Sequence, residues 1–483
     1  MIDQILRHMD AKTPEHRAWW RYYEGDHPLK FSTKKLADYW DIRDAPFVEN
    51  WVSVVANAVI DRLVLTGFTV ADNEPANDAL SEIFDAGQWS TLASEVHQSV
   101  VVTGEGFAIS QIDDTDQRGD VETYSQVAAN CAAVYDPAHP RRMLCAAKRL
   151  YDETGAEPVW RLYIYYPDRT EKYTGTKNAK SFKDFTLDED GVIGNPYGTI
   201  PVFHFRNDAR RPRPDFESVI PLQDAVNKQF ADLMVVSDTT AFPLRYLISA
   251  ADVKLPKLRP GDFVNIPGAA GDEQQTVVGS FAAANLNVYT ESKSDLAHAI
   301  ASISRTPRHY FTGADGQPSG EALQAMEAPL VKKVKAYMAR LSNTWEHAAA
   351  YALRLKGVVV DPADIAATWD DPRTVQTISQ AQARATNVQA GIPIMTLLRD
   401  EGWRDSELDQ MAEDAQMQKG PAEAMPLDAA ATDAQTAVAA ANLAPVVESV
   451  VQMIGDVALA KILEGDRLDR IIATKQAEIA PNG

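Results

Sequence analysis

Cysteine is scarce in this sequence, and several familiar signals are missing altogether. The 483 residues include two cysteines, Cys131 and Cys145, which are too few for a disulfide framework and indicate a reducing compartment such as the cytoplasm. Cysteines and histidines never cluster in fours, so no zinc site is predicted. No apolar run approaches the roughly 18–20 residues that a membrane-spanning helix needs. The N-terminus lacks the apolar segment of an export signal, and we expect no membrane anchor.

The motifs of nucleotide-binding and catalytic sites are also missing. GEGFAI at 104–109 resembles the start of a dinucleotide-binding fingerprint, but it lacks the third glycine and follows a predicted helix where a strand is required. TLDEDG at 186–191 resembles half of a calcium loop without its bidentate glutamate, and a hairpin turn is expected instead. His204, in the strand-like run IPVFHF, is expected to be a core or edge-strand histidine rather than a base. We therefore predict no catalytic residue, no cofactor and no metal ligand.

Positive charge is in short supply. The chain has 47 lysine and arginine residues against 68 aspartate and glutamate residues, a formal net charge of −21. This balance argues against a protein that grips nucleic acid over a broad surface, because such binding depends on cations that displace counterions. It is compatible with a protein past which DNA slides, since an acidic wall repels phosphates over about 8–10 Å. The basic run VKKVKAYMAR at 331–340 is expected to be a solvated helix face or part of an inter-subunit salt-bridge network rather than a DNA-binding site.

What is present has the composition of a folded protein, with 45% hydrophobic and 24% charged residues. Helical spacing of apolar residues dominates residues 1–70. Residues 105–205 change to short aromatic and β-branched runs separated by Asp, Gly and Pro, which predict an antiparallel sheet with hairpins. Helical periodicity returns at Asp215 and stops at Pro243, and a strand-and-turn insert follows at about 243–285.

A second helical stretch leads into RTPRHYFTGADGQPSG at 305–320, which holds three glycines and two prolines and is predicted to be a flexible loop. The longest pattern follows it. Ser319 is expected to cap this helix and Pro329 to kink it. Its apolar residues recur every three or four positions: Leu323, Met326, Leu330, Val334, Tyr337, Leu341, Trp345, Ala348, Ala352 and Leu355.

The order of several segments resembles a known family. The segments are RAWWRYYEGDHPL, NWVSVVANAVIDRLVLTGF, IPVFHFRN, ESVIPLQDAVNKQFADLMVVSDTTAFPLRYL and ASISRTPRHYFTGADGQPSGEALQAMEAPLVKKVKAYMARLSNTWEHA. Over roughly residues 15–410 they resemble the portal proteins of tailed bacteriophages, of the SPP1-like group common in phages of actinobacteria. The most specific parts are IPV followed by ESVIPLQDAVNK, and SRTPxxYF followed by SGEAL.

The resemblance implies an α+β fold, predominantly helical, with a mixed α/β wing, a helical stem, a small strand-containing clip and a helical crown. It implies the following boundaries: a wing at 1–214, stem helices at 215–242 and 286–304, the clip at 243–285, a tunnel loop at 305–320, a long kinked helix and a wing strand at 321–373, and the crown with a C-terminal tail at 374–483.

The resemblance also implies a function and its partners. Such portals form a homo-oligomeric ring, typically a dodecamer, at one vertex of the capsid, after assembly in the bacterial host cytoplasm. They are not enzymes; the ring conducts double-stranded DNA during genome packaging and ejection. The expected partners are the major capsid protein, the terminase large subunit and a head–tail adaptor protein, with no membrane. The alternatives are another phage ring component, such as an adaptor or connector, and an enzyme with an unrecognised site.

Two sets of candidate site residues follow from this placement. The tunnel loop supplies residues that would face the DNA: Arg305, Arg308, His309, Tyr310, Gly313 and Gly316. Its glycines give backbone freedom, and its basic side chains can touch phosphates without gripping them; salt bridges within the protein are the alternative. The stem supplies acidic candidates, whose orientation toward the bore the sequence does not specify: Asp224, Asp232, Asp238, Glu291 and Asp295.

Overall fold

The computed structural model divides the chain into two units, Met1–Ile392 and Pro393–Gly483. The second unit is described only at 393–394 and 396–397, so the fold below is that of the first. The structure describes residues 2–28, 48–71, 73–112, 120–155, 157–208, 210–241, 245–249, 263–267, 277–280, 285–312, 319–373, 386–388, 390–394 and 396–397.

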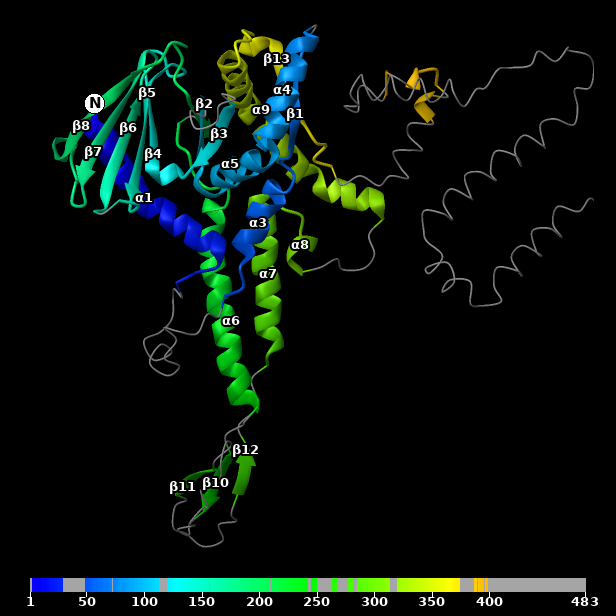
Figure 1. The fold of residues 1–483 in the computed structure, drawn as a ribbon. Helices are drawn as coiled ribbons and strands as arrows, with labels where there is room; N and C mark the ends of the chain where they lie inside the picture. Colours follow the sequence, from blue (N-terminus) through cyan, green and yellow to red (C-terminus); the bar gives the residue numbers. More distant parts are fainter. Residues whose placement is uncertain are drawn as a thin grey trace, which may run out of the picture. The chain divides into compact units, whose positions relative to one another are not determined.

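Helices dominate the start of the first unit (Figure 1). They are α1 (Ile2–Glu24), α3 (Trp51–Ile60), α4 (Glu74–Ala86) and α5 (Trp89–Thr103). Asn50 and Asn73 begin α3 and α4, because each side chain accepts a hydrogen bond from the backbone amide three residues later, at 3.1 and 3.2 Å. The helical prediction for 1–70 is confirmed where this region is described, except that its end forms a strand, β1 (Leu65–Val70).

The region after α5 folds into two antiparallel sheets where the sequence predicts one. The first has the strand order β3–β2–β9, and the second is a meander in the order β4–β5–β6–β7–β8. Short 3-10 helices at Ala128–Asn130 and Phe182–Asp184 precede β4 and β8. The strands are β2 (Glu105–Ile112), β3 (Val121–Gln126), β4 (Cys131–Tyr135), β5 (Met143–Asp152), β6 (Val159–Tyr165), β7 (Arg169–Thr176), β8 (Phe185–Gly194) and β9 (Val202–Arg206).

One local prediction in this region is wrong. TLDEDG, expected to form a hairpin turn, lies inside β8. Both ends of β8 pair with the same strand, β7, and the register shifts between Glu171 and Tyr173. The acidic residues are therefore an irregularity in an edge strand, which the turn-like composition alone cannot distinguish from a chain reversal.

The first half of α1 covers one face of the five-stranded sheet (Figure 1). Ile5, Leu6 and Met9 are buried there in one cluster with Cys145. Cys131 is buried in the neighbouring cluster, and burial raises the pKa of its thiol to about 12. Both cysteines are free thiols, as the composition predicts, and neither is placed to act as a nucleophile.

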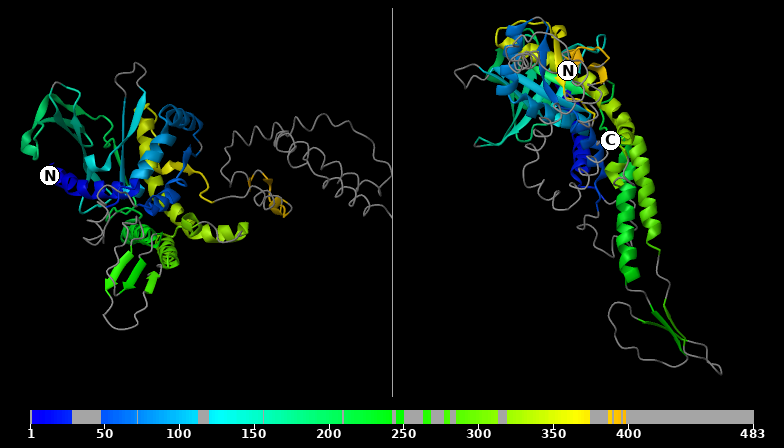
Figure 2. Two further views of the ribbon diagram at one scale, coloured as in Figure 1. Left: turned by 90° about the horizontal axis from the view of Figure 1, so that it is seen from below. Right: turned by 90° about the vertical axis from the view of Figure 1, so that its right-hand side faces the viewer.

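Two long helices lie side by side in the middle of the chain (Figures 1 and 2). They are α6 (Ile220–Ala241), which follows a 3-10 turn at Glu217–Val219, and α7 (Asn287–Ser304). Gln229 of α6 donates to the Ser292 hydroxyl of α7 at 2.6 Å. The structure thus has helices at both positions where the sequence predicts them.

The insert between α6 and α7 forms a sheet in the order β11–β10–β12. β10 (Arg245–Ser249) lies in the centre, parallel to β11 (Phe263–Pro267) and antiparallel to β12 (Val277–Ser280). Within the described residues, the outer edges of β11 and β12 have no partner strand. An unpaired edge is a template for pairing with another chain.

The chain then passes through the short helix α8 (His309–Thr312) into α9 (Gly320–Leu355). Ser319 caps α9 by accepting from the Ala322 amide at 3.3 Å, which confirms the predicted cap, and Pro329 lies inside the helix. After α9, a 3-10 turn at Pro362–Asp364 leads into β13 (Ile365–Trp369), which pairs antiparallel with β1.

The apolar stripe of α9 forms the centre of the main core. Most of its predicted members are buried, from Leu330 through Leu341 to Ala352, whereas Met326 in the second turn is 42% exposed. The indole of Trp345 lies 4.6 Å from the ring of Phe205 on β9 and 5.8 Å from that of Trp89 on α5, between ring centroids. One helix therefore packs against elements from both the helical and the sheet regions.

His97 of α5 is fully buried beside Trp345. Its Nδ1 lies 2.8 Å from the carbonyl oxygen of Leu63, and its Nε2 lies 2.9 Å from the indole nitrogen of Trp345. A carbonyl accepts and an indole N–H donates, so both contacts are satisfied only by a neutral imidazole protonated at Nδ1. Burial lowers the pKa of His97 to about 4.

The buried His97 predicts a loss of stability in mild acid. The unfolded histidine titrates near 6.5, so the unfolded chain binds a proton between about pH 6.5 and pH 4 that the folded chain does not. The contribution is complete above pH 6.5 and is lost toward pH 4, on the order of 3 kcal/mol. Urea unfolding between pH 4.5 and 7.5 should show a flatter pH dependence for His97→Gln than for the wild type.

The matched control is His139→Gln, which replaces an exposed histidine and should keep the wild-type pH dependence. Parallel curves for His97→Gln and wild type would show that His97 is not held neutral in the folded state.

Candidate functional site

The segment 305–320 lies between α7 and α9, and the structure describes its first half. The sequence predicts a loop, which is wrong for His309–Thr312, because these residues form α8. The amides of Tyr310 and Phe311 donate to the carbonyls of Pro307 and Arg308 at 3.1 and 3.0 Å. His309–Thr312 contain neither glycine nor proline; Pro307 precedes this helix and Gly313 follows it.

α8 is attached to α3 by these aromatic residues. The ring of Phe311 meets that of Trp51 edge to face, at 5.8 Å between centroids. The Tyr310 hydroxyl donates to the Glu327 carboxylate of α9 at 3.1 Å and accepts from the Arg62 guanidinium at 2.6 Å. Burial raises the pKa of Tyr310, which remains a neutral donor. Tyr310, predicted to face DNA, is thus engaged within its own chain.

The basic residues of the segment lie at its exposed start. Arg305 ends α7 in the left-handed conformation, with φ 60°, and its side chain is exposed. Arg308 is exposed as well, and His309 is half-buried with its ring against Tyr310 at 4.7 Å. A left-handed conformation is unusual for a residue other than glycine, and it turns the chain sharply away from the helix. Gly313 and Gly316 lie outside the described residues.

The acidic candidates on α6 and α7 separate into buried and exposed residues. Asp224 is 3% exposed and accepts a hydrogen bond from the Tyr22 hydroxyl of α1 at 2.8 Å, so it is not a surface carboxylate in this chain. Asp232 is half-buried and paired with Lys228, one helical turn earlier. Glu291 and Asp295 are exposed on α7, and the side chain of Asp238 lies outside the described residues.

A buried ion pair joins the segment just before α6, the end of α7 and the middle of α9. Lys333 Nζ pairs with the Asp215 carboxylate and donates to the Ser304 carbonyl at 2.8 Å. The Tyr337 hydroxyl donates to the same carboxylate at 3.2 Å. Lys333 belongs to the predicted basic run 331–340, and here it serves an interaction within the chain. The exposed lysines of that run, Lys332 and Lys335, fit the predicted solvated face.

GEGFAI is a structural corner and not a nucleotide site. Helix α5 precedes it and strand β2 follows, the reverse of the strand–helix order that a dinucleotide site requires. Gly104 has φ 86°, and a Cβ there would lie 2.0 Å from the backbone nitrogen of Arg213. The glycine is required because two chain segments cross at that point.

Glu105, next to this glycine, is the centre of a buried polar cluster. It accepts from Lys12 Nζ at 2.5 Å and from His204 Nε2 at 2.8 Å. Burial raises the pKa of Glu105, but the His204 and Lys12 contacts outweigh burial and lower it to about 2. The ring of His204 also stacks on Phe107 at 4.3 Å. His204 is an edge-strand histidine of the sheet, as predicted, and the cluster fastens α1 to it.

Groups of three or more His, Cys, Asp or Glu side chains that could hold a metal ion are absent from the described part of the chain. Among the same residues, no helix is both long and apolar enough to cross a membrane.

The comparison with protein families decides the identity. A model described as "Phage portal protein, SPP1 Gp6-like" matches residues 2–421 of this chain. The chain belongs to this family of phage portal proteins. The resemblance read from the sequence is thereby confirmed, and so is the mixed α+β fold class. A portal protein is a structural, non-enzymatic component of the virion.

Two curated relatives match part of this portal protein. It is 32% identical to the portal protein of Mycobacterium phage D29 over 149 residues. The aligned segment covers 29% of this chain and 31% of the relative. It is 30% identical over 149 residues, with the same coverage, to the portal protein of Mycobacterium phage L5. The chain thus spans about a third of the length of these relatives.

Solved structures with a similar course of the chain come from gene transfer agents. One is the neck of an empty particle, with a TM-score of 0.40 and 14% identity over 74% of this chain and 89% of the other. Another is the virion of a native particle, with a TM-score of 0.41 and 13% identity over 78% and 90%.

Proposed function

We propose that copies of this chain form a dodecameric ring at one vertex of the capsid, through which double-stranded DNA passes during packaging and ejection. One observation carries the proposal: this member of the portal family has two long helices, α6 and α7, side by side, and α7 ends in a turn with two exposed arginines. In the proposed ring, α6 and α7 form the stem, β10–β12 the clip, and 305–320 the tunnel loop. The segment 374–483, proposed as the crown and tail, lies almost entirely outside the described residues.

Charge supports the passage of DNA without adhesion. Twelve copies of a chain with a net charge of −21 give a ring of about −250, a field that disfavours binding of a polyanion. Lys12 and Lys333 lie in buried pairs with Glu105 and Asp215, so these two cations are not available to phosphates. The exposed carboxylates Glu291 and Asp295 of α7 are the candidates for the wall of the bore.

Partners follow from the same assignment. The sequence contains no G-x-x-x-x-G-K-[ST] loop, and we propose that a separate terminase, through its large subunit, supplies the energy of packaging and docks on the clip. A head–tail adaptor protein would use the same surface after packaging, and the major capsid protein would surround the wing.

Electron microscopy of the purified full chain tests the ring directly. Projections should show annular particles with a central channel, and the preparation should not hydrolyse ATP. A ring without a helical stem would favour another ring component of the phage. A monomer with ATPase activity would contradict the proposal altogether.

The unpaired edges of the clip sheet predict a role in closing the ring. Val278 of β12 is 62% exposed, and Val278→Glu should place a charge where a neighbouring copy is proposed to pair. Most of the variant should elute from size exclusion as species smaller than the ring. Val127→Glu, at a valine of the same exposure outside the clip, is the control and should form rings. Wild-type ring yield for Val278→Glu would remove the clip from the interface.

Removing the two exposed arginines should impair DNA packaging without impairing ring assembly. Arg305→Ala combined with Arg308→Ala should leave rings intact and lower the DNA content of particles several-fold, since each arginine can contribute a weak phosphate contact. The control, Arg141→Ala with Arg142→Ala, removes an exposed arginine pair between β4 and β5 and should package normally. Full genomes in particles that carry the first pair of changes would show that these arginines are not DNA contacts.

A further inference from the structure

Arg62 occupies a junction that the proposed function does not explain. It follows the end of α3, and its side chain is 16% exposed. One guanidinium there contacts segments that lie far apart in the sequence. Its Nη1 donates to the Ala58 carbonyl of α3 at 3.3 Å, which holds the group against its own helix.

The first distant partner of Arg62 is the proposed tunnel loop. Nη2 donates to the Tyr310 hydroxyl of α8 at 2.6 Å and lies 3.4 Å from the Glu327 carboxylate of α9. Glu327 is buried and also accepts from Tyr310 at 3.1 Å. The three side chains each contact the other two and form a closed triangle. Tyr310 precedes Gly313 and Gly316 in the sequence, and Glu327 follows them.

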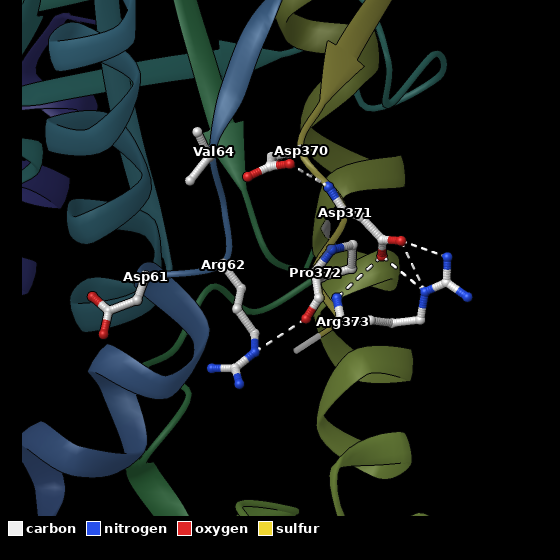
Figure 3. A pocket seen from close by; sticks show the side chains of 7 residues that line it. All are labelled: Asp61, Arg62, Val64, Asp370, Asp371, Pro372 and Arg373. Carbon is white, nitrogen blue, oxygen red and sulfur yellow. Dashed lines mark hydrogen bonds and ion pairs between the residues drawn. The ribbon is translucent and has the colours of Figure 1, made fainter. Parts of the chain in front are cut away.

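The second distant partner is the chain that leaves β13. Nε of Arg62 donates to the Pro372 carbonyl at 3.1 Å, and Figure 3 shows the side chain reaching from the end of α3 to this carbonyl. Arg62 and Pro372 both line a cavity of about 240 Å³ together with Asp61 and Asp370. Beyond Pro372 the chain continues into the region proposed as the crown.

The chemistry of these contacts requires an arginine. A guanidinium presents donors in a fixed planar fork, so Nε and Nη2 can serve two directions at once. A lysine has one nitrogen on a flexible stem and cannot hold both the Pro372 carbonyl and the Tyr310–Glu327 pair in the same geometry. Tyr310 and the Pro372 carbonyl therefore share one planar group, through which a change at Tyr310 can reach Pro372.

We propose that Arg62 is a positioning residue that couples the tunnel loop to the chain entering the C-terminal region. With the Tyr310–Arg62–Glu327 triangle closed, α8 is held against α3 and the Pro372 carbonyl is held with it. When the contacts of Arg62 with Tyr310 and Glu327 break, both α8 and the Pro372 carbonyl are released. This inference rests on the proposed function for the identity of the loop, whereas the coupling itself is a property of the chain.

Hydrogen exchange of assembled full-length protein measures the coupling in two segments, 305–312 and 370–373. Tyr310→Phe keeps the aromatic packing and removes only the hydroxyl. It should speed exchange in 305–312 by about tenfold and also speed exchange in 370–373, a segment to which Tyr310 is linked through Arg62. Arg62→Lys should speed exchange in both segments. Combining the two changes should add nothing further in 370–373, since the shared group is already lost.

A matched control is Arg161→Lys, which changes an arginine paired with Asp152 at 2.6 Å in the five-stranded sheet and should alter neither segment. If Tyr310→Phe alters 305–312 alone, Tyr310 is a local packing residue and the coupling is refuted. If full genomes are packaged by the Arg305 and Arg308 double variant while the exchange result holds, the DNA contact fails and the coupling stands. The two failures are therefore distinguishable.

Discussion

Covering the apolar stripe of α9 is the constraint on which the rest of the first unit depends. That stripe is buried by His97 and Trp89 of α5, by Phe205 of β9 and by β13, whose Trp369 donates to Ser342 of α9 at 2.8 Å. None of these elements can bury its own apolar face alone. Because they all meet on one helix, α3, α4, α5, β9 and β13 share one core with buried residues of α6 and α7, whereas the first half of α1 and the five-stranded sheet form separate clusters.

α6 and α7 are attached to this core by both apolar and polar contacts. Val226 of α6 and Ile300 of α7 are buried in it. Lys333, Asp215 and Ser304 join the segment just before α6 to the end of α7, and Gln223 of α6 accepts from the backbone amides of Trp51 and Val52. Buried ion pairs of this kind contribute little net stability, since desolvation offsets their attraction, but breaking one is costly. An ion pair whose members lie on separate elements favours one relative placement of those elements.

Buried pairs also hold several of the cations of the chain. Lys12, Arg62 and Lys333 are directed into buried pairs with Glu105, Glu327 and Asp215, so these cations do not reach the surface. A protein with an unfavourable formal charge for DNA binding can still present arginines at one chosen turn, after α7.

The sequence by itself determined what short-range physics decides: the family, through ordered motifs; the long helices, through their apolar period; the Ser319 cap; and the lack of a disulfide framework. It could not decide which polar side chains find partners far away in the chain. Asp224 looked like a stem carboxylate and is buried against Tyr22, and Tyr310 looked like a DNA-facing residue and is bound to Arg62 and Glu327. Arg62 carries no sequence signal at all, because its partners lie on average hundreds of positions away and only the tertiary fold brings them to one guanidinium.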